Sequence, residues 1–161
     1  KLVTWIESHD TYANQGESAK MTHFQLRAGW AIITARQYGT PLFFSRPQGP
    51  EATQFPGVSQ IGDKGNDEFM HPEVVAVNKF RDAMVGEGEK FSNGTTRQTL
   101  IIERGNKGVV IVNLKDGTEQ IKHKVGLADG EYIDHANGIK FKVQDGILTG
   151  KIKASKIAVI Y

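Results

Sequence analysis

The chain has 161 residues, a hydrophobic fraction of 39%, no cysteine and a formal net charge of +2. This length and composition suit one globular domain or two small ones and exclude a disordered tail. The absence of cysteine excludes disulfides, thiolate metal sites and a cysteine nucleophile. No stretch approaches the ~18 consecutive apolar residues of a membrane span, so we expect no membrane span. No signal peptide is visible either.

The charge is distributed unevenly along the chain. Up to Lys90 there are 9 Lys and Arg against 11 Asp and Glu, and from Phe91 onward there are 11 against 7. Many lysines of the second part alternate with apolar residues, as in residues 139–143, which is typical of a sheet with one solvated face. Because these lysines are not interleaved with aromatic residues, we favour a solvated face over a nucleic-acid surface.

The chain begins with a predicted strand that ends in a polar cluster. Residues 2–6 are mostly apolar or β-branched, which is typical of a strand buried on both faces of a parallel sheet. Glu7, Ser8, His9 and Asp10 follow directly, at the strand end where parallel sheets hold their ligand sites. The same residues suit a turn, with Asp10 or Ser8 as its cap and His9 as an ordinary loop residue. The residues alone leave both interpretations open.

A helix and a second strand are predicted next. Thr22 and Gln25 have the spacing of a capping box, which predicts the start of a helix. We expect Gly39, in the left-handed backbone conformation, to form the C-terminal cap of this helix. Residues 42–44 form the second predicted buried strand, and Arg46 lies among the polar residues that follow it.

A long loop and a second helix complete the first part of the chain. Residues 50–70 show no periodicity, and a loop of this length usually serves or covers a binding site. Pro72 suits the first turn of a helix whose apolar stripe extends to Val85. Two strand–helix units imply parallel pairing of their strands.

The second part of the chain changes to the alternating period of strands. Residues 86–93 are the predicted boundary, which divides domain 1–87 from domain 88–161. Five Asn-Gly or Asp-Gly pairs lie between or beside the alternating runs and favour hairpins. Seven short strands therefore predict an antiparallel β-sandwich. The runs are residues 99–104, 108–114, 118–125, 131–134, 139–143, 147–153 and 157–161.

Several segments of the first part resemble the α-amylase family of retaining glycoside hydrolases. Residues 5–10, WIESHD, are similar to the family's fourth conserved region, in which a barrel strand ends in a His-Asp pair. Residues 11–14, TYAN, resemble the continuation found in bacterial extracellular α-amylases. Residues 26–30, 38–44 and 72–80 are similar to the last barrel strand and its flanking helices.

The resemblance implies a fold for each part of the chain. Residues 1–87 would form the last two β/α units of a (β/α)8 barrel, and residues 88–161 an antiparallel Greek-key β-sandwich. A complete barrel needs eight units and about 250 residues. We therefore expect the chain to be a fragment of a longer, extracellular enzyme. Its open edge would be covered by the missing N-terminal part or by self-association.

The resemblance also implies an activity and roles for two residues. The activity is endo-hydrolysis of α-1,4-glucosidic bonds in starch and maltooligosaccharides. Asp10 aligns with the carboxylate that stabilises the transition state, and His9 with a residue that hydrogen-bonds the same sugar. Retaining hydrolysis needs a nucleophile and an acid about 5–5.5 Å apart. We do not expect Glu7 and Asp10 to form that pair, and the family implies that both groups lie outside this chain, which would be inactive alone.

Other residues keep more than one interpretation. Arg46 is either a substrate-binding residue or the partner of a carboxylate in a structural ion pair. Tyr12 and Trp5 are candidates for stacking on sugars, although core packing is favoured for Trp5. The role of Glu7 is left open. The family implies a calcium ion, with ligands that are not in this chain.

Two alternative functions are carried forward. The first is another reaction of the family, transglycosylation or α-1,6 cleavage. The second is a non-catalytic sandwich that binds a glycan or a protein. A glycan-binding face should expose aromatic residues, and the second part offers only Phe91, Tyr132, Phe141 and Tyr161.

Overall fold

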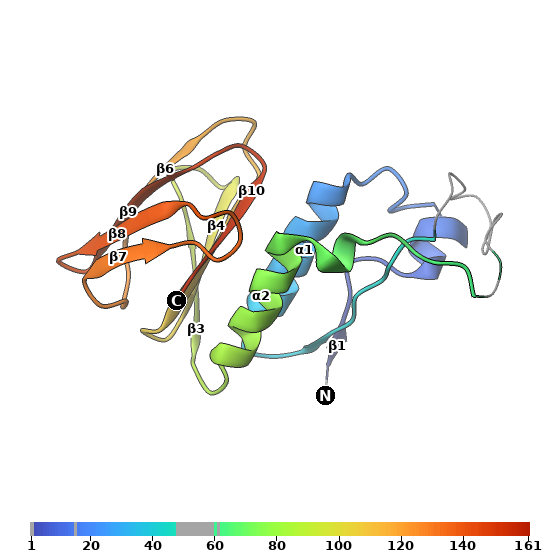
Figure 1. Cartoon of the computed structure of the whole chain (residues 1–161), viewed down its shortest axis with the longest axis horizontal. Coiled ribbons are helices and arrows are strands. Elements are labelled where there is room, and N and C mark those ends of the chain that lie inside the picture. Colours follow the sequence, from blue (N-terminus) through green and yellow to red (C-terminus); the bar gives the residue numbers. More distant parts are fainter. Residues whose placement is uncertain (1, 15, 48–59, 61) are drawn as a thin grey trace.

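The elements of the chain are arranged in successive layers (Figure 1). The structure, a computed structural model, describes residues 2–14, 16–47, 60 and 62–161. Two four-stranded sheets are followed by two helices, and the short strands β1 (Val3–Thr4) and β2 (Thr40–Pro41) lie beyond the helices. Most of the predicted loop at residues 50–70 lies outside the described residues.

The sheet next to the helices is antiparallel and has the strand order β10-β5-β4-β3. Its strands are β3 (Glu89–Asn93), β4 (Thr99–Arg104), β5 (Gly108–Asn113) and β10 (Lys156–Ile160). Every residue of β5 is buried. The reason is that helices cover one face of this sheet and the second sheet covers the other.

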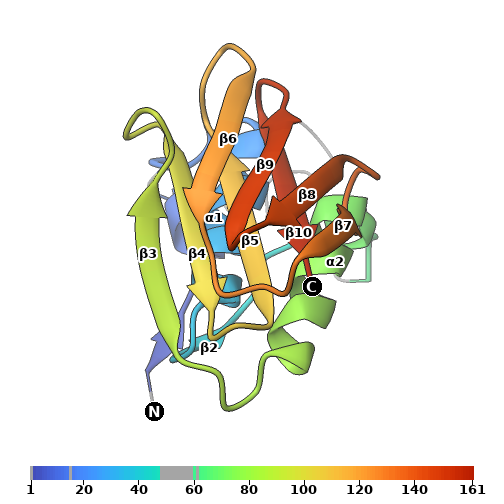
Figure 2. The ribbon, with the colours of Figure 1, turned by 90° about the vertical axis from the view of Figure 1, so that its left-hand side faces the viewer.

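The second sheet is a Greek key with the strand order β6-β9-β8-β7. Its strands are β6 (Glu119–Lys124), β7 (Gly130–Ile133), β8 (Lys140–Gln144) and β9 (Ile147–Ile152). Strands β7, β8 and β9 pair in the order of the sequence. Strand β6 precedes them in the chain and pairs with the last of them, β9. Figure 2 shows this sheet in front of the first one, with the helices behind both. All seven predicted strands of the second part are present.

The turn between β8 and β9 shows why an Asp-Gly pair predicts the turn of a hairpin. Asp145 and Gly146 have φ values of 53° and 71°, and Gln144 pairs with Ile147 across the turn. A two-residue turn with positive φ at both positions matches the right-handed twist of the strands that it joins. The register of this hairpin is therefore set by local sequence.

Two apolar cores separate the layers. One lies between the helices and the first sheet, and Phe80 of helix α2 (Pro72–Ala83) packs edge-on against Tyr161 there at 5.7 Å between ring centroids. The other lies between the two sheets, with side chains of both inner faces fully covered. This second core includes Ile101, Ile111, Ile121, Phe141, Val143, Leu148 and Ile160.

The helices begin where predicted, but the first one ends earlier. Helix α1 (His23–Ala35) has the capping box of Thr22 and Gln25, and α2 (Pro72–Ala83) starts at the predicted proline. Gly39 has the positive φ of 93° but lies in the turn before β2. Neither helix has the length and apolar character of a membrane span, within the residues that the structure describes.

Arg81 of α2 gives the physical reason for the early end of α1. Its guanidinium donates to the carbonyls of Thr34 at 3.1 Å and Arg36 at 2.9 Å, and also to that of Gly39. If α1 continued to Gly39, the carbonyls of Thr34 and Arg36 would accept hydrogen bonds from the helix itself. In the structure they accept them from Arg81 instead. A side chain 42 residues away in sequence therefore replaces the predicted glycine cap.

The two strands of the first part are shorter and more exposed than predicted. They are parallel, with Val3 opposite Thr40, but β2 precedes the predicted residues 42–44. Leu2 is 71% exposed and Trp5 is 55% exposed, so the predicted burial of both is wrong for this chain. A two-stranded sheet leaves most of its edges and one face uncovered, and the described residues form no closed barrel.

Strand β3 was not predicted, because its residues lie in the segment expected to be a boundary. It is the edge strand of the first sheet and pairs only with β4. Phe91 is 42% exposed and carries the guanidinium of Arg36 over its ring at 5.3 Å. Charged and polar residues are typical of protected edge strands, and they conceal the alternating pattern.

Gly108 is expected to control the packing of α2 on the first sheet. A Cβ at this position would lie 2.5 Å from the ring of Phe80 and 3.0 Å from Met84. We predict that Gly108→Ala lowers the free energy of unfolding by about 1–3 kcal/mol in denaturant titration, because the core is overpacked. Gly117→Ala is the matched control, since its Cβ would meet open space. Equal stability of the two variants would contradict this account.

Candidate functional site

The polar segment after β1 turns at once into a short helical element. Residues Asp10–Asn14 form a single π-helical turn, a feature that is frequent at functional sites. The side chains of His9 and Asp10 are 55% and 53% exposed, and His9 Nε2 lies 3.4 Å from Asp10 Oδ1. The structure therefore places these two predicted site residues side by side at the surface.

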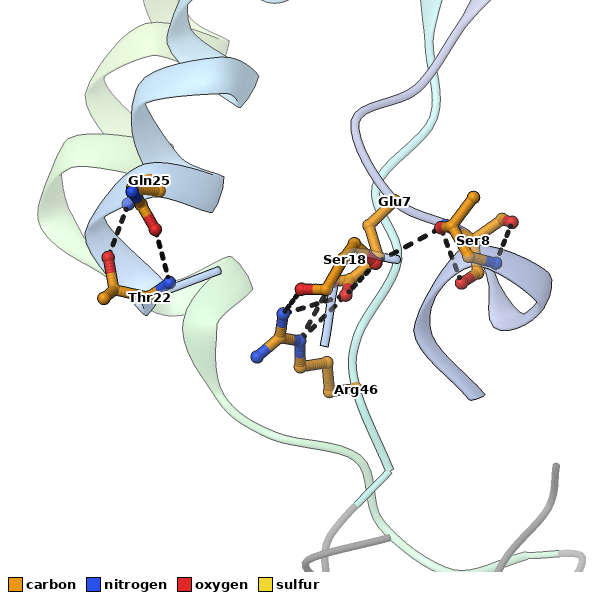
Figure 3. A network of polar contacts seen from close by, with 7 residues as sticks. Glu7, Ser8, Ser18, Thr22, Gln25 and Arg46 are labelled. Atoms are coloured by element: carbon orange, nitrogen blue, oxygen red, sulfur yellow. Dashed lines mark hydrogen bonds and ion pairs between the residues drawn. The ribbon is translucent and has the colours of Figure 1, made fainter. Parts of the chain in front are cut away.

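Glu7 forms a buried ion pair with Arg46 (Figure 3). The two residues are 5% and 8% exposed. Arg46 Nε lies 3.0 Å from both carboxylate oxygens of Glu7, and its Nη2 lies 2.9 Å from Oε1. The guanidinium also lies over the ring of Tyr12, at 4.7 Å from the centroid. One of the two interpretations of Arg46 predicts such a structural ion pair with a carboxylate.

Ser18 links this ion pair to the turn that carries His9 and Asp10. Its hydroxyl donates to Glu7 Oε1 at 2.8 Å, and its carbonyl accepts from Arg46 Nη2 at 2.8 Å. The same hydroxyl lies 3.3 Å from Thr11 Oγ1, which in turn accepts from the backbone N–H of Ser8 at 2.9 Å. The ion pair and the turn therefore belong to one hydrogen-bond network (Figure 3).

A second charged cluster lies at the start of both helices. Arg27 of α1 donates to Glu73 at 2.9 Å and to Glu68 at 2.7 Å, and His23 Nδ1 lies 3.0 Å from Glu68. Burial alone would raise the pKa of Glu68, but the hydrogen bond and charge of Arg27 outweigh it, and the pKa is lowered. Glu68 is therefore held in its ionised form.

His71 is held neutral at the N-terminus of α2. Its Nδ1 accepts from the backbone N–H of Glu73 at 3.2 Å, which caps the helix. Burial and the charge of Arg27 lower the pKa of His71, against the opposing effect of Glu73 and Glu68. A neutral imidazole can accept this hydrogen bond, whereas the protonated ring cannot.

Two curated proteins are similar to this chain along nearly its full length. An alpha-amylase of Butyrivibrio fibrisolvens is 43% identical over 99% of the chain, and one of Clostridium acetobutylicum is 38% identical over 100%. The predicted resemblance to the α-amylase family is confirmed. The chain spans only 17% and 20% of the length of these two α-amylases. No family model matches it.

Solved α-amylase structures share the fold of the chain. Alpha-amylase I of Eisenia fetida, in a mutant complex with maltohexaose, superposes with a TM-score of 0.72 at 18% identity. The match covers 98% of this chain and 40% of that one. An Anoxybacillus alpha-amylase gives a TM-score of 0.60 at 15% identity, over 99% of this chain and 38% of that one. At this identity the likeness concerns the fold alone.

The predicted site residues of this chain fall into two groups. His9 and Asp10 lie together at the surface, whereas Arg46 is buried against Glu7. A contact between Arg46 and a sugar stays a prediction. Sequence reasoning missed Ser18, because a serine in a polar loop carries no signal of its partners 11 and 28 residues away.

The described residues do not fit a metal site. Among them, no group of three or more His, Asp or Glu side chains could hold a metal ion. A calcium ion needs 6–8 oxygen ligands, mostly carboxylates and carbonyls. The calcium ion that the resemblance implies stays a prediction, and no ligand for it is assigned to this chain.

The lowered pKa of Glu68 gives a testable pH dependence. Its ionised form stabilises the fold above the ordinary value of 4.5, and this contribution is lost as the pH falls through the lower pKa of the folded state. We predict that Glu68→Gln shows a smaller loss of stability than the original chain between about pH 6 and pH 3 in urea titration. Glu17→Gln, at an exposed position, is the control and should follow the original chain. Parallel curves for all three proteins would refute the role of Glu68.

Proposed function

We propose that this chain supplies His9 and Asp10 to the active site of an α-amylase that cleaves internal α-1,4-glucosidic bonds of starch with retention. The observation that carries the proposal is the exposed His9–Asp10 pair at the carboxyl end of a parallel strand. The similarity of the whole chain to two α-amylases supports it.

Asp10 suits the role of transition-state stabiliser. An ionised carboxylate can accept hydrogen bonds from two sugar hydroxyls. These bonds strengthen as positive charge grows on the sugar ring, so Asp10 would bind the transition state more tightly than the ground state. A neutral His9 can donate its imidazole N–H to a further hydroxyl of the same sugar.

The first part of the chain is proposed to complete a (β/α)8 barrel. The exposed apolar side chains of Leu2, Val3, Trp5 and Leu42 are 44–71% exposed and lie on or beside β1 and β2, where neighbouring strands of a barrel would cover them. In this proposal the nucleophile and the general acid lie outside the chain, which is inactive alone. We also propose secretion and a calcium site formed by residues outside this chain.

The substitution Asp10→Asn tests the proposed role. It removes the negative charge and keeps the shape, so we predict that kcat on starch falls by about 10²–10³ in the full-length enzyme, as for loss of one transition-state contact. The dissociation constant for starch should change by less than about threefold, because the effect concerns the transition state. Asp82→Asn, at an exposed position of α2, should keep normal turnover. Near-normal turnover of Asp10→Asn would refute the assignment.

Product analysis tests the bond that is cleaved. We expect the full-length enzyme to release maltooligosaccharides of the α-anomeric form from starch and to leave the α-1,6 bonds of pullulan intact. Chromatography and NMR of the first products would show this. Cleavage of α-1,6 bonds, or longer products formed by transfer, would favour another reaction of the family.

A further inference from the structure

We propose that the buried Glu7–Arg46 ion pair is the positioning element of the site. It fixes the backbone of residues 8–12 and thereby the directions of His9 and Asp10. Neither residue of the pair touches substrate in this account. The inference rests on the proposed function, since positioning matters only if His9 and Asp10 contact the sugar.

Arg46 contacts three residues of the polar segment through a single planar group. Its guanidinium binds the carboxylate of Glu7, the carbonyl of Ser18 and the ring face of Tyr12. Glu7 lies beyond the end of β1, whereas Arg46 lies beyond the end of β2. The pair therefore fastens the turn to both strand ends at once.

The residues on either side of His9 and Asp10 are all anchored to this network. On one side, Ser8 donates its N–H to Thr11 Oγ1 at 2.9 Å. On the other side, Thr11 contacts Ser18, and Tyr12 lies under the guanidinium of Arg46. A short segment held at both ends has few backbone conformations, so the Cα–Cβ bonds of His9 and Asp10 keep a fixed direction.

The chemistry of Arg46 also favours an indirect role. Its Nε and Nη2 are both engaged with protein oxygens, and the residue is 8% exposed. A buried carboxylate such as Glu7 needs a paired cation, because an unpaired charge is strongly destabilising. Arg46 is therefore committed to Glu7, and it acts on the reaction through the turn.

The test uses the full-length enzyme with kinetics on maltohexaose. Glu7→Gln removes the charge of the carboxylate, and Arg46→Lys keeps the positive charge but loses the planar fork that reaches Ser18. We expect kcat of the folded enzyme to fall about 10–100-fold in both variants, with KM changed by less than about threefold. Ser18→Ala removes only the hydroxyl link and should lower kcat a few-fold; this milder variant covers the case in which the others fail to fold.

The chain offers a matched control in a second Arg–Glu pair, in which the carboxylate is buried. Glu73 accepts from Arg27 Nε at 2.9 Å and is 1% exposed, but no described contact joins it to residues 8–12. Glu73→Gln should lower Tm without changing kcat of the folded enzyme. If it lowers kcat as much as Glu7→Gln does, the effect of the latter is general destabilisation and the proposal is overturned.

Amide hydrogen exchange separates this inference from the proposed function. We expect Glu7→Gln to speed exchange at residues 9–12 by at least about tenfold, while Glu73→Gln leaves these amides unchanged. Unchanged exchange and unchanged kcat in Glu7→Gln would overturn the positioning role even if Asp10→Asn abolishes turnover. Faster exchange together with normal turnover of Asp10→Asn would instead overturn the proposed function and leave the anchoring of the turn intact.

Discussion

Glu73 is a buried carboxylate that ties three elements of the structure together. Its Oε1 accepts from the backbone N–H of Ile157 in β10 at 3.1 Å, and its Oε2 accepts from Arg27 of α1 at 2.9 Å. Glu73 itself belongs to the first turn of α2 and is 1% exposed. Because an unpaired charge at this depth would be strongly destabilising, the two helices and the first sheet must assemble together.

The helix layer also contacts both the first sheet and the short strand β2. On its sheet side, Arg104 of β4 donates to the carbonyls of Ala35 and Met84 at the ends of both helices. On its other side, α1 packs against the strand ends, with Trp30 edge-on to Phe43 at 5.0 Å between ring centroids. The second part of the chain therefore helps to hold the first part in place.

The two Arg–Glu pairs with a buried carboxylate have different consequences for function. The pair of Arg27 and Glu73 joins regular elements, so its effect is spread over the whole fold. The pair of Glu7 and Arg46 joins irregular backbone at two strand ends, where few other contacts define the conformation. The same chemistry thus stabilises the scaffold in one place and sets the geometry of an exposed pair of side chains in the other.

The sequence by itself determined the features whose signals are local. The capping box at Thr22, the two-residue turn at Asp145 and the alternating or continuously apolar runs of the seven strands all depend on residues within a few positions of one another. The resemblance of residues 5–14 to a family motif also lies within one short segment. Only the tertiary structure decided the partner of Glu7, the end of α1 at Ala35 and the exposure of β1 and β2. Each of these depends on groups about 35 or more residues apart in sequence, or on neighbouring strands, and no local pattern records such contacts.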